Sequence, residues 1–418
     1  MTTASEPKPH DPFAALRIKE FSFFICARFF LTLGIQMQSV IVGWQIYSLT
    51  KNVLDLGYIG LTEALPFIAV SFFSGHVADL ISRKKIILVG TSFLVLSTAT
   101  LCWLSTDVSG IIHRFGTTPI FFLIAATGII RAFVGPAFPS FMSQLIPRSH
   151  YTNAATWNST VWHTGFIAGN GLGGLLCMLG MPLAYGIDSC IIFSSMAFVT
   201  FIAAKPIPVK EKIESLTESL SVGLNFVFKN KIILGALSLD LFAVLFGGAV
   251  AMLPAFVDKI LHVGPTQFGL LRAAPATGAV ITAIILAYRP QKKNAGRNLL
   301  IAIAGFGLSM ILFAISENYY LSLFLLALSG AFDNVSVVVR HTILQLLTPD
   351  NMRGRVSAVN SIFIGSSNEI GGFESGLTAR MMGLVPSVVF GGAMTLIIVA
   401  ITAKVSPAIR KLNLKSIE

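Results

Sequence analysis

The stretch GHVADLISRKK, residues 75–85, lies between two long apolar segments and guides the interpretation of the whole chain. It contains Asp79 and three consecutive cations, Arg83 to Lys85, which the pattern places in a tight turn. Short loops rich in lysine and arginine lie on the cytoplasmic side of membrane proteins and fix their orientation. The stretch therefore predicts a cytoplasmic loop between two membrane-spanning helices.

The composition is that of a membrane protein. Of the 418 residues, 54% are hydrophobic and only 12% are charged, and the mean hydropathy is +0.78. Soluble domains carry about 25% charged residues. The net charge of +11 does not indicate a nucleic-acid partner, because the cations lie in loops between apolar runs. We therefore predict a polytopic protein embedded in the lipid bilayer.

Apolar runs of about 20 residues, the length at which a helix crosses a bilayer, recur along the chain. We predict an all-α fold with twelve membrane-spanning helices. The predicted spans are 21–48, 54–79, 85–105, 119–145, 152–180, 183–204, 231–257, 265–288, 298–316, 319–346, 354–381 and 384–404. An even number of spans places both termini on the same side of the membrane.

The positions of lysine and arginine predict which side that is. Of 30 such residues, 22 fall on the side of the termini and 4 on the opposite side, the others lying within spans. Because an excess of cations marks cytoplasmic segments, both termini are expected in the cytoplasm. Residues 1–20 and 405–418 are then the two cytoplasmic tails.

The middle of the chain predicts a boundary between two halves. Residues 205–230 are charged at first and then amphipathic, as in a cytoplasmic linker that ends in an interfacial helix. The linker separates an N-terminal half, residues 21–204, from a C-terminal half, residues 231–404. These halves resemble each other: GYIGLTEALP (57–66) aligns with QFGLLRAAP (267–275). We therefore expect two related six-helix halves.

Glycines recur at helical spacing in the fifth and eleventh predicted spans. Small residues four apart let membrane helices approach each other closely, so we predict helix-packing motifs there. The residues are Gly165, Gly169, Gly173 and Gly174 in the fifth span, and Gly371 and Gly376 in the eleventh. In the alignment of the two halves, Gly371 falls on Gly169 and Gly376 on Gly174.

Two motifs resemble signatures of the major facilitator superfamily. The loop signature Gly-x-x-x-Asp-Arg-x-Gly-Arg-Arg, which marks a conformational gating loop, is matched at Gly75, Asp79, Arg83 and Lys84. Leu80 and Ser82 depart from it. The glycines of the fifth span resemble the antiporter signature Gly-x-x-x-Gly-Pro-x-x-Gly-Gly, but Asn170 replaces the proline, which weakens the direction of transport that the motif implies.

Longer stretches resemble the enterobactin-exporter-like branch of this superfamily. They are residues 241–261, 269–275 and 332–369, and the resemblance extends over nearly all of residues 20–405. It implies the major facilitator fold, with two pseudo-symmetric six-helix halves. It also implies proton-driven export of a small organic molecule, siderophore-like or drug-like, across the cytoplasmic (inner) membrane of a bacterium.

Charged residues inside the predicted spans mark the candidate site. A charge at a helix centre costs about 2.5–3.5 kcal/mol on insertion scales, so such residues tend to face a cavity or a partner. The candidates for proton coupling or for lining the substrate cavity are Glu63, Arg131, Asp240, Asp333, Glu369 and Glu374. Arg28, Asp188 and Arg340 lie close to span ends, where we expect them to reach the membrane surface.

A proton-coupled carrier needs a carboxylate whose pKa is raised by desolvation, and an arginine that displaces its proton is an advantage. Asp333 and Arg131 lie at similar depths in repeat-related spans and fit these roles. Glu63 and Glu374 are predicted at similar depths in neighbouring spans, where they would share a proton. The alternative is a fixed ion pair that only holds helices together, such as Glu374 with Arg272.

Four side chains of the fifth span are candidates for the cavity wall: Trp157, Trp162, His163 and Asn170. His163 fits a packing histidine at least as well. Tryptophans also serve as anchors at the membrane interface, and both alternatives stay open.

The sequence contains no motif of the enzyme classes or of ATP-driven pumps. HExxH, GxSxG and the nucleotide loop GxxxxGK[ST] are absent, and the four cysteines show no CxxC spacing. We therefore predict no enzyme, no metal and no other cofactor. The expected partners are a small-molecule substrate and protons, and one chain suffices as a monomer. A facilitator-fold importer, a uniporter and a lipid flippase are the alternatives.

Overall fold

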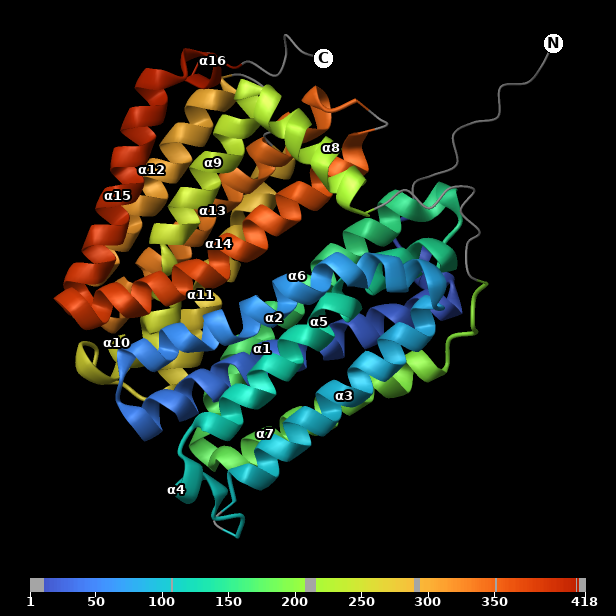
Figure 1. The fold of residues 1–418 in the computed structure, drawn as a ribbon, viewed down its shortest axis with the longest axis vertical. Coiled ribbons are helices and arrows are strands. Elements are labelled where there is room, and N and C mark those ends of the chain that lie inside the picture. The colour runs from blue at the N-terminus through green and yellow to red at the C-terminus, as the bar shows by residue number, and fades with distance from the viewer. Residues whose placement is uncertain are drawn as a thin grey trace.

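The computed structural model describes residues 11–106, 108–206, 216–288, 294–349, 352–410 and 412. Over these residues the chain forms helices and no strand. Figure 1 shows two bundles of long helices, the first drawn in blue to green and the second in yellow to red. The predicted all-α membrane fold built from two helical halves is therefore confirmed.

The long helices follow the predicted spans in chain order. The first bundle contains α1 (Lys19–Thr50), α2 (Val53–Leu80), α3 (Arg83–Leu104), α5 (Thr118–Leu145), α6 (Tyr151–Leu176) and α7 (Met181–Thr200). The second contains α9 (Lys231–Phe246), α10 (Leu253–Lys259), α11 (Pro265–Tyr288), α12 (Ala295–Ala314), α13 (Tyr319–Leu347), α14 (Arg353–Met382) and α15 (Leu384–Val405). The shorter elements are η1 (Ala15–Arg17), α4 (Ile111–Phe115), η2 (Arg148–His150), η3 (Cys177–Leu179), α8 (Leu216–Lys229), η4 (Gly248–Met252) and α16 (Pro407–Arg410).

Ten segments of the described chain are long and apolar enough to cross a membrane. The two other predicted spans correspond to α6 and α14, which have 26 and 30 residues but are more polar. Both helices contribute to the contact between the bundles. Polar side chains in membrane helices face the protein interior or a cavity, which accounts for their composition. For these two helices the crossing of the membrane stays a prediction.

The seventh predicted span, residues 231–257, is not one continuous helix. α9 ends at Phe246, η4 follows, and α10 begins at Leu253. The break begins at Gly247, where an added Cβ would come within 2.6 Å of the Phe306 ring. Only glycine fits at this contact, and glycine inside a helix weakens it.

The two halves repeat the same helix contacts. A Cβ on Gly169 of α6 would fall 2.5 Å from the Leu33 carbonyl oxygen of α1. Likewise, a Cβ on Gly371 of α14 would fall 2.8 Å from the Leu245 carbonyl oxygen of α9. In both places two helix backbones touch, as small residues permit. The predicted correspondence of Gly169 with Gly371 therefore recurs in the packing.

The bundles join through two helix pairs, α6 with α11 and α2 with α14. A Cβ on Gly174 would lie 2.7 Å from the Cα atom of Gly269, and one on Gly376 would lie 2.9 Å from the Cα atom of Gly57. These contacts lie in the part of the molecule away from the two chain ends, and in Figure 1 the bundles diverge toward the termini. We call the joined part the closed end.

Candidate functional site

An ion pair links α2 and α5 in the middle of the first bundle. Arg131 Nη1 contacts Glu63 Oε1. The helices are close enough because Gly128 packs on the Glu63 carbonyl oxygen, which a Cβ there would approach to 2.4 Å. The Arg131 and Glu63 side chains keep 39% and 21% of their surface exposed. The pair therefore borders space that solvent reaches.

The second bundle repeats this packing with a different charge. Gly330 of α13 packs on the Pro275 carbonyl oxygen of α11, and Asp333 follows three residues later, as Arg131 follows Gly128. Asp333 is half-buried. Among the residues that the structure describes, none forms an ion pair or hydrogen bond with its carboxylate. The two repeat-related positions thus hold a paired arginine and an aspartate without such a partner.

Arg272, which aligns with Glu63, reaches across to the other bundle. Its Nη2 atom donates to Ser39 Oγ on α1 at 2.7 Å. The alternative pairing of Glu374 with Arg272 does not occur, because the half-buried Glu374 carboxylate has no ion-pair partner in the described chain. Arg272 therefore helps to hold the two halves together in this conformation.

The contact between α2 and α14 sets the depth of the carboxylates on these helices. Tyr58 packs against Phe373, with ring centroids 5.7 Å apart. Because the helices run antiparallel, Glu63 is level with Glu369, and Glu374 lies about 7 Å nearer the closed end. The two predicted partners Glu63 and Glu374 therefore do not share a depth. The side chain of Glu369 lies outside the described part of the chain.

A second ion pair joins α9 and α13. Arg340 Nη1 contacts Asp240 Oδ1, and these side chains are only 4% and 8% exposed. The expectation that Arg340 reaches the membrane surface is wrong, because it points into the bundle toward α9. Opposite charges in two apolar spans were the signal in the sequence, but the position of Arg340 near a span end concealed it.

The same correction applies to Arg28 and Asp188. Arg28 is half-buried and its guanidinium lies over the Phe138 ring, 5.1 Å from the centroid. Asp188 is fully buried. Closeness to a span end does not tell which face of a helix a residue occupies.

The candidates on α6 occupy three different surroundings. Trp162 keeps 36% of its surface exposed and packs edge-on against His163, with centroids 4.9 Å apart. Trp157 instead binds the N-terminal tail, since its Nε1 atom donates to the Pro12 carbonyl oxygen at 2.9 Å. Asn170 is fully buried at the contact with α11 and donates to a carbonyl of its own helix. Trp162 and His163 are thus the pair that lies nearest to open space.

The predicted gating loop connects helices of the first bundle. Ser82 caps α3, and the buried Arg83 follows it directly. Lys84 Nζ donates to the Thr200 carbonyl oxygen at 3.0 Å, so the cation satisfies a free carbonyl at the end of α7. The side chains of Gly75 and Asp79 lie outside the described part of the chain.

A polar contact that the sequence did not indicate joins the halves at the closed end. Asp258 of α10 accepts from Lys51 Nζ at 3.0 Å and from Tyr47 Oη at 3.1 Å, both from the end of α1. In the described residues, no group of three or more His, Cys, Asp or Glu side chains is placed to hold a metal ion.

This architecture defines a membrane transporter of the major facilitator type: two related bundles in one chain, joined at one end by close helix contacts, with charged side chains in their middle. The chain belongs to the transmembrane secretion effector family, whose pattern matches residues 10–417. The family and its relatives are transporters and not enzymes.

Curated relatives agree with the predicted branch of the superfamily. The chain is 25% identical over 374 residues to the enterobactin exporter EntS of Shigella flexneri, covering 89% of this chain and 88% of that protein. It is 25% identical over 368 residues to EntS of Salmonella typhi, covering 88% and 87%. The predicted resemblance to enterobactin exporters is therefore confirmed.

Solved structures share the fold. A variant of the nucleoside transporter NupG superposes with a TM-score of 0.75 at 12% identity, over 93% of this chain and 99% of that one. A bacterial homolog of the human lysosomal transporter Spinster, inward-facing and unoccupied, gives a TM-score of 0.69 at 13% identity, over 99% and 98%. At these identities the likeness shows the fold alone.

Proposed function

We propose that the protein is a secondary active transporter that exports a small organic molecule in exchange for protons. The observation that carries this proposal is the asymmetry between the halves at repeat-related positions. One half holds the solvent-reached ion pair of Glu63 and Arg131, and the other holds Asp333, whose carboxylate has no partner among the described residues. Charged groups inside a membrane bundle mark substrate and proton pathways.

The conformation supports alternating access. The bundles touch at the closed end and diverge toward the termini. With both termini in the cytoplasm, as the distribution of lysine and arginine favours, this is a state open to the cytoplasm. Export then requires the closed end to separate and the opposite end to close, by rocking of one half against the other.

The residues take different roles in this mechanism. Asp333 carries the proton, and Glu374 and Glu369 are further carboxylates that modulate its loading. Arg131, held by Glu63, supplies a fixed positive charge on the opposite side of the site. Asp240 is best explained as a structural residue, because its pair with Arg340 is almost entirely buried.

The remaining candidates position the moving parts. Trp162 and His163 form part of the cavity wall on α6. The glycines of α6 and α14 let the bundles slide in close contact, and the loop that contains Gly75, Asp79, Arg83 and Lys84 couples α2 to the helices beside it. One chain contains both halves, so a monomer is the working unit.

The cargo class follows from the relatives and from the site. Proteins named enterobactin exporters share 25% identity with this chain, which favours a siderophore-like cargo. Carboxylates beside aromatic side chains also suit amphipathic, drug-like cations. We therefore propose a siderophore-like or amphipathic drug-like molecule as cargo.

The test is uptake into everted membrane vesicles. A catecholate siderophore and a lipophilic cationic dye are offered separately, with and without an imposed inside-acid pH gradient. We expect accumulation of one of them above equilibration, dependent on the gradient and abolished by a protonophore. Flux that only equilibrates would contradict proton coupling and would indicate a uniporter. Vesicles without the protein are the control.

A further inference from the structure

Asp188 lies on α7 inside the first bundle, away from the charged groups described above. It is fully buried, and neither carboxyl oxygen has a hydrogen-bond partner in the described chain. A Cβ on Gly34 of α1 would lie 3.2 Å from its Oδ1 atom, so α1 packs directly on the carboxyl group. An isolated ionised carboxylate is very costly in an apolar interior, so such a group pairs, binds a cation or takes up a proton.

The neighbouring elements supply no counter-ion for Asp188. α7 packs mainly against α1 and α3, and touches α6 and η3 near its start. The titratable groups on these elements nearest to Asp188 are Arg28 on α1, Cys102 on α3, Cys177 in η3 and Tyr185 on α7 itself. Of these, only Arg28 is a cation, and it stacks on the Phe138 ring instead.

A metal ion does not fit the surroundings of Asp188 either. Level with it on α3 is the buried Ser97, whose hydroxyl has no hydrogen-bond partner among the described residues. A carboxylate and one hydroxyl are too few ligands for a metal ion, which takes about four to eight. A proton needs only the carboxylate.

A row of buried polar groups leads from Asp188 toward the closed end. The first step is Gln38 of α1, whose Nε2 atom donates to Thr98 Oγ1 on α3 at 2.7 Å. Two turns further along both helices, Gln45 Nε2 donates to Ser105 Oγ at 2.9 Å. The buried Tyr185, three residues before Asp188 on α7, donates from its hydroxyl to Gln45 Oε1 at 2.7 Å.

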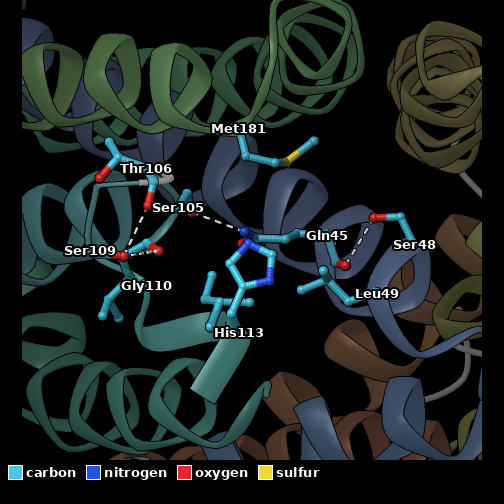
Figure 2. Close-up of a pocket in the computed structure, with 11 residues that line it drawn as sticks. Gln45, Ser48, Leu49, Ser105, Thr106, Ser109, Gly110, His113 and Met181 are labelled. Carbon is cyan, nitrogen blue, oxygen red and sulfur yellow. Dashed lines mark hydrogen bonds between the residues drawn. The ribbon is translucent and has the colours of Figure 1, made fainter. Parts of the chain in front are cut away.

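The row ends at a pocket, which Figure 2 shows. The pocket has a volume of about 250 Å³ and is lined by Gln45 and Ser105 together with Ser48, Ser109 and His113. His113 is exposed, so the pocket reaches the surface, and in Figure 2 its ring lies beside Gln45. A polar pocket at the closed end thus adjoins the hydroxyl of Tyr185 through one amide.

We propose that Asp188 is a proton-binding site that exchanges with the surface at the closed end through this pocket and Tyr185. A proton enters from water in the pocket. The Tyr185 hydroxyl gives its own proton toward the Asp188 carboxylate and regains one from the pocket side, so no charge is left on the phenol. On the proposed orientation this surface faces the outside, and the contribution of Asp188 to transport rests on the proposed function. The binding itself does not.

The first experiment is infrared spectroscopy of the purified protein in lipid, recorded as the pH is varied over the range in which it stays folded. We expect a carboxylic-acid carbonyl band that disappears reversibly as the pH rises. The band should be missing in Asp188→Asn and present in the matched control Glu374→Gln. A band of Asp188 that never titrates would mean a permanently neutral structural acid and would overturn the proposal. No such band at any pH would overturn it as well.

The second experiment tests the route with Tyr185→Phe, which removes only the hydroxyl. After a jump of the external pH, the Asp188 band should respond several-fold more slowly in this variant, with the same endpoint. An unchanged rate would overturn the route through Tyr185. If the unaltered protein fails to accumulate cargo in vesicles, the proposed function fails, whereas the titration still decides the role of Asp188.

Discussion

The two halves of the molecule use the same packing for different chemistry. In the first half, Gly128 lets α5 approach α2, and Arg131 follows and pairs with Glu63. In the second half, Gly330 lets α13 approach α11, and Asp333 follows with no ion pair to any described residue. A repeat in the backbone therefore does not impose a repeat in charge.

This difference teaches which half can change its charge. An arginine stays protonated at any physiological pH, and its pairing with Glu63 fixes the charge of that carboxylate too. A half-buried aspartate that lacks a counter-ion is able to gain and lose a proton. The first half then supplies a constant electrostatic field, and the second half supplies the group that responds to the proton gradient.

The largest expected effect is that of Asp333→Asn. Asparagine keeps the size of the side chain but does not take up a proton, so we expect gradient-driven accumulation to fall to the level of vesicles without the protein. The measurement is cargo uptake in everted vesicles, with the amount of folded protein checked by size-exclusion chromatography in detergent.

Glu374→Gln is the matched control for this change. It also neutralises a half-buried carboxylate without an ion pair in the described chain, but we expect transport to persist with a shifted pH dependence. If Asp333→Asn still concentrated cargo against a gradient, the assignment of the proton to the second half would fail.

The next effect concerns stability and the buried pair of the second half. Arg340→Met leaves Asp240 buried without its partner, which should destabilise the protein by about 3–5 kcal/mol. The double variant Asp240→Asn with Arg340→Met should recover most of this loss, because no charge is left unpaired. Thermal unfolding in detergent measures both. A single variant that unfolds like the unaltered protein would show that the pair contributes nothing.

Much of the fold could be predicted from the sequence, because the signals are local. Runs of apolar residues give the helices, and the cations of residues 83–85 lie at the turn between α2 and α3. The glycine alignment also held, since Gly169 and Gly371 pack on equivalent helices in the two halves. A contact that needs a small residue leaves a visible mark in the sequence.

The charged partners could not be predicted in the same way. A position along a span gives depth, but pairing also depends on which face of the helix a residue occupies. Glu63 therefore pairs with Arg131 rather than lying level with Glu374, and Arg340 points into the bundle although it lies near a span end. Asp188 was discounted for the same reason.

The smallest expected effect concerns the contact by which the two halves meet. Asp258 accepts hydrogen bonds from Lys51 and Tyr47, which belong to the other bundle. The Lys51 and Asp258 side chains are 58% and 37% exposed, and pairs of this kind contribute only about 0.2–1 kcal/mol. Asp258→Asn should therefore shift the population away from the described conformation by no more than roughly fivefold.

The measurement is the rate of thiol labelling at Ser39→Cys, in a background without the four native cysteines. Ser39 lies between the halves, so its labelling should rise when the closed end opens more often. Lys259→Met is the matched control, because it changes a neighbouring charge that forms no ion pair with any described residue. Equal labelling in Asp258→Asn and the control would show that the glycine contacts alone hold the halves together, and that the polar contact only covers the surface around them.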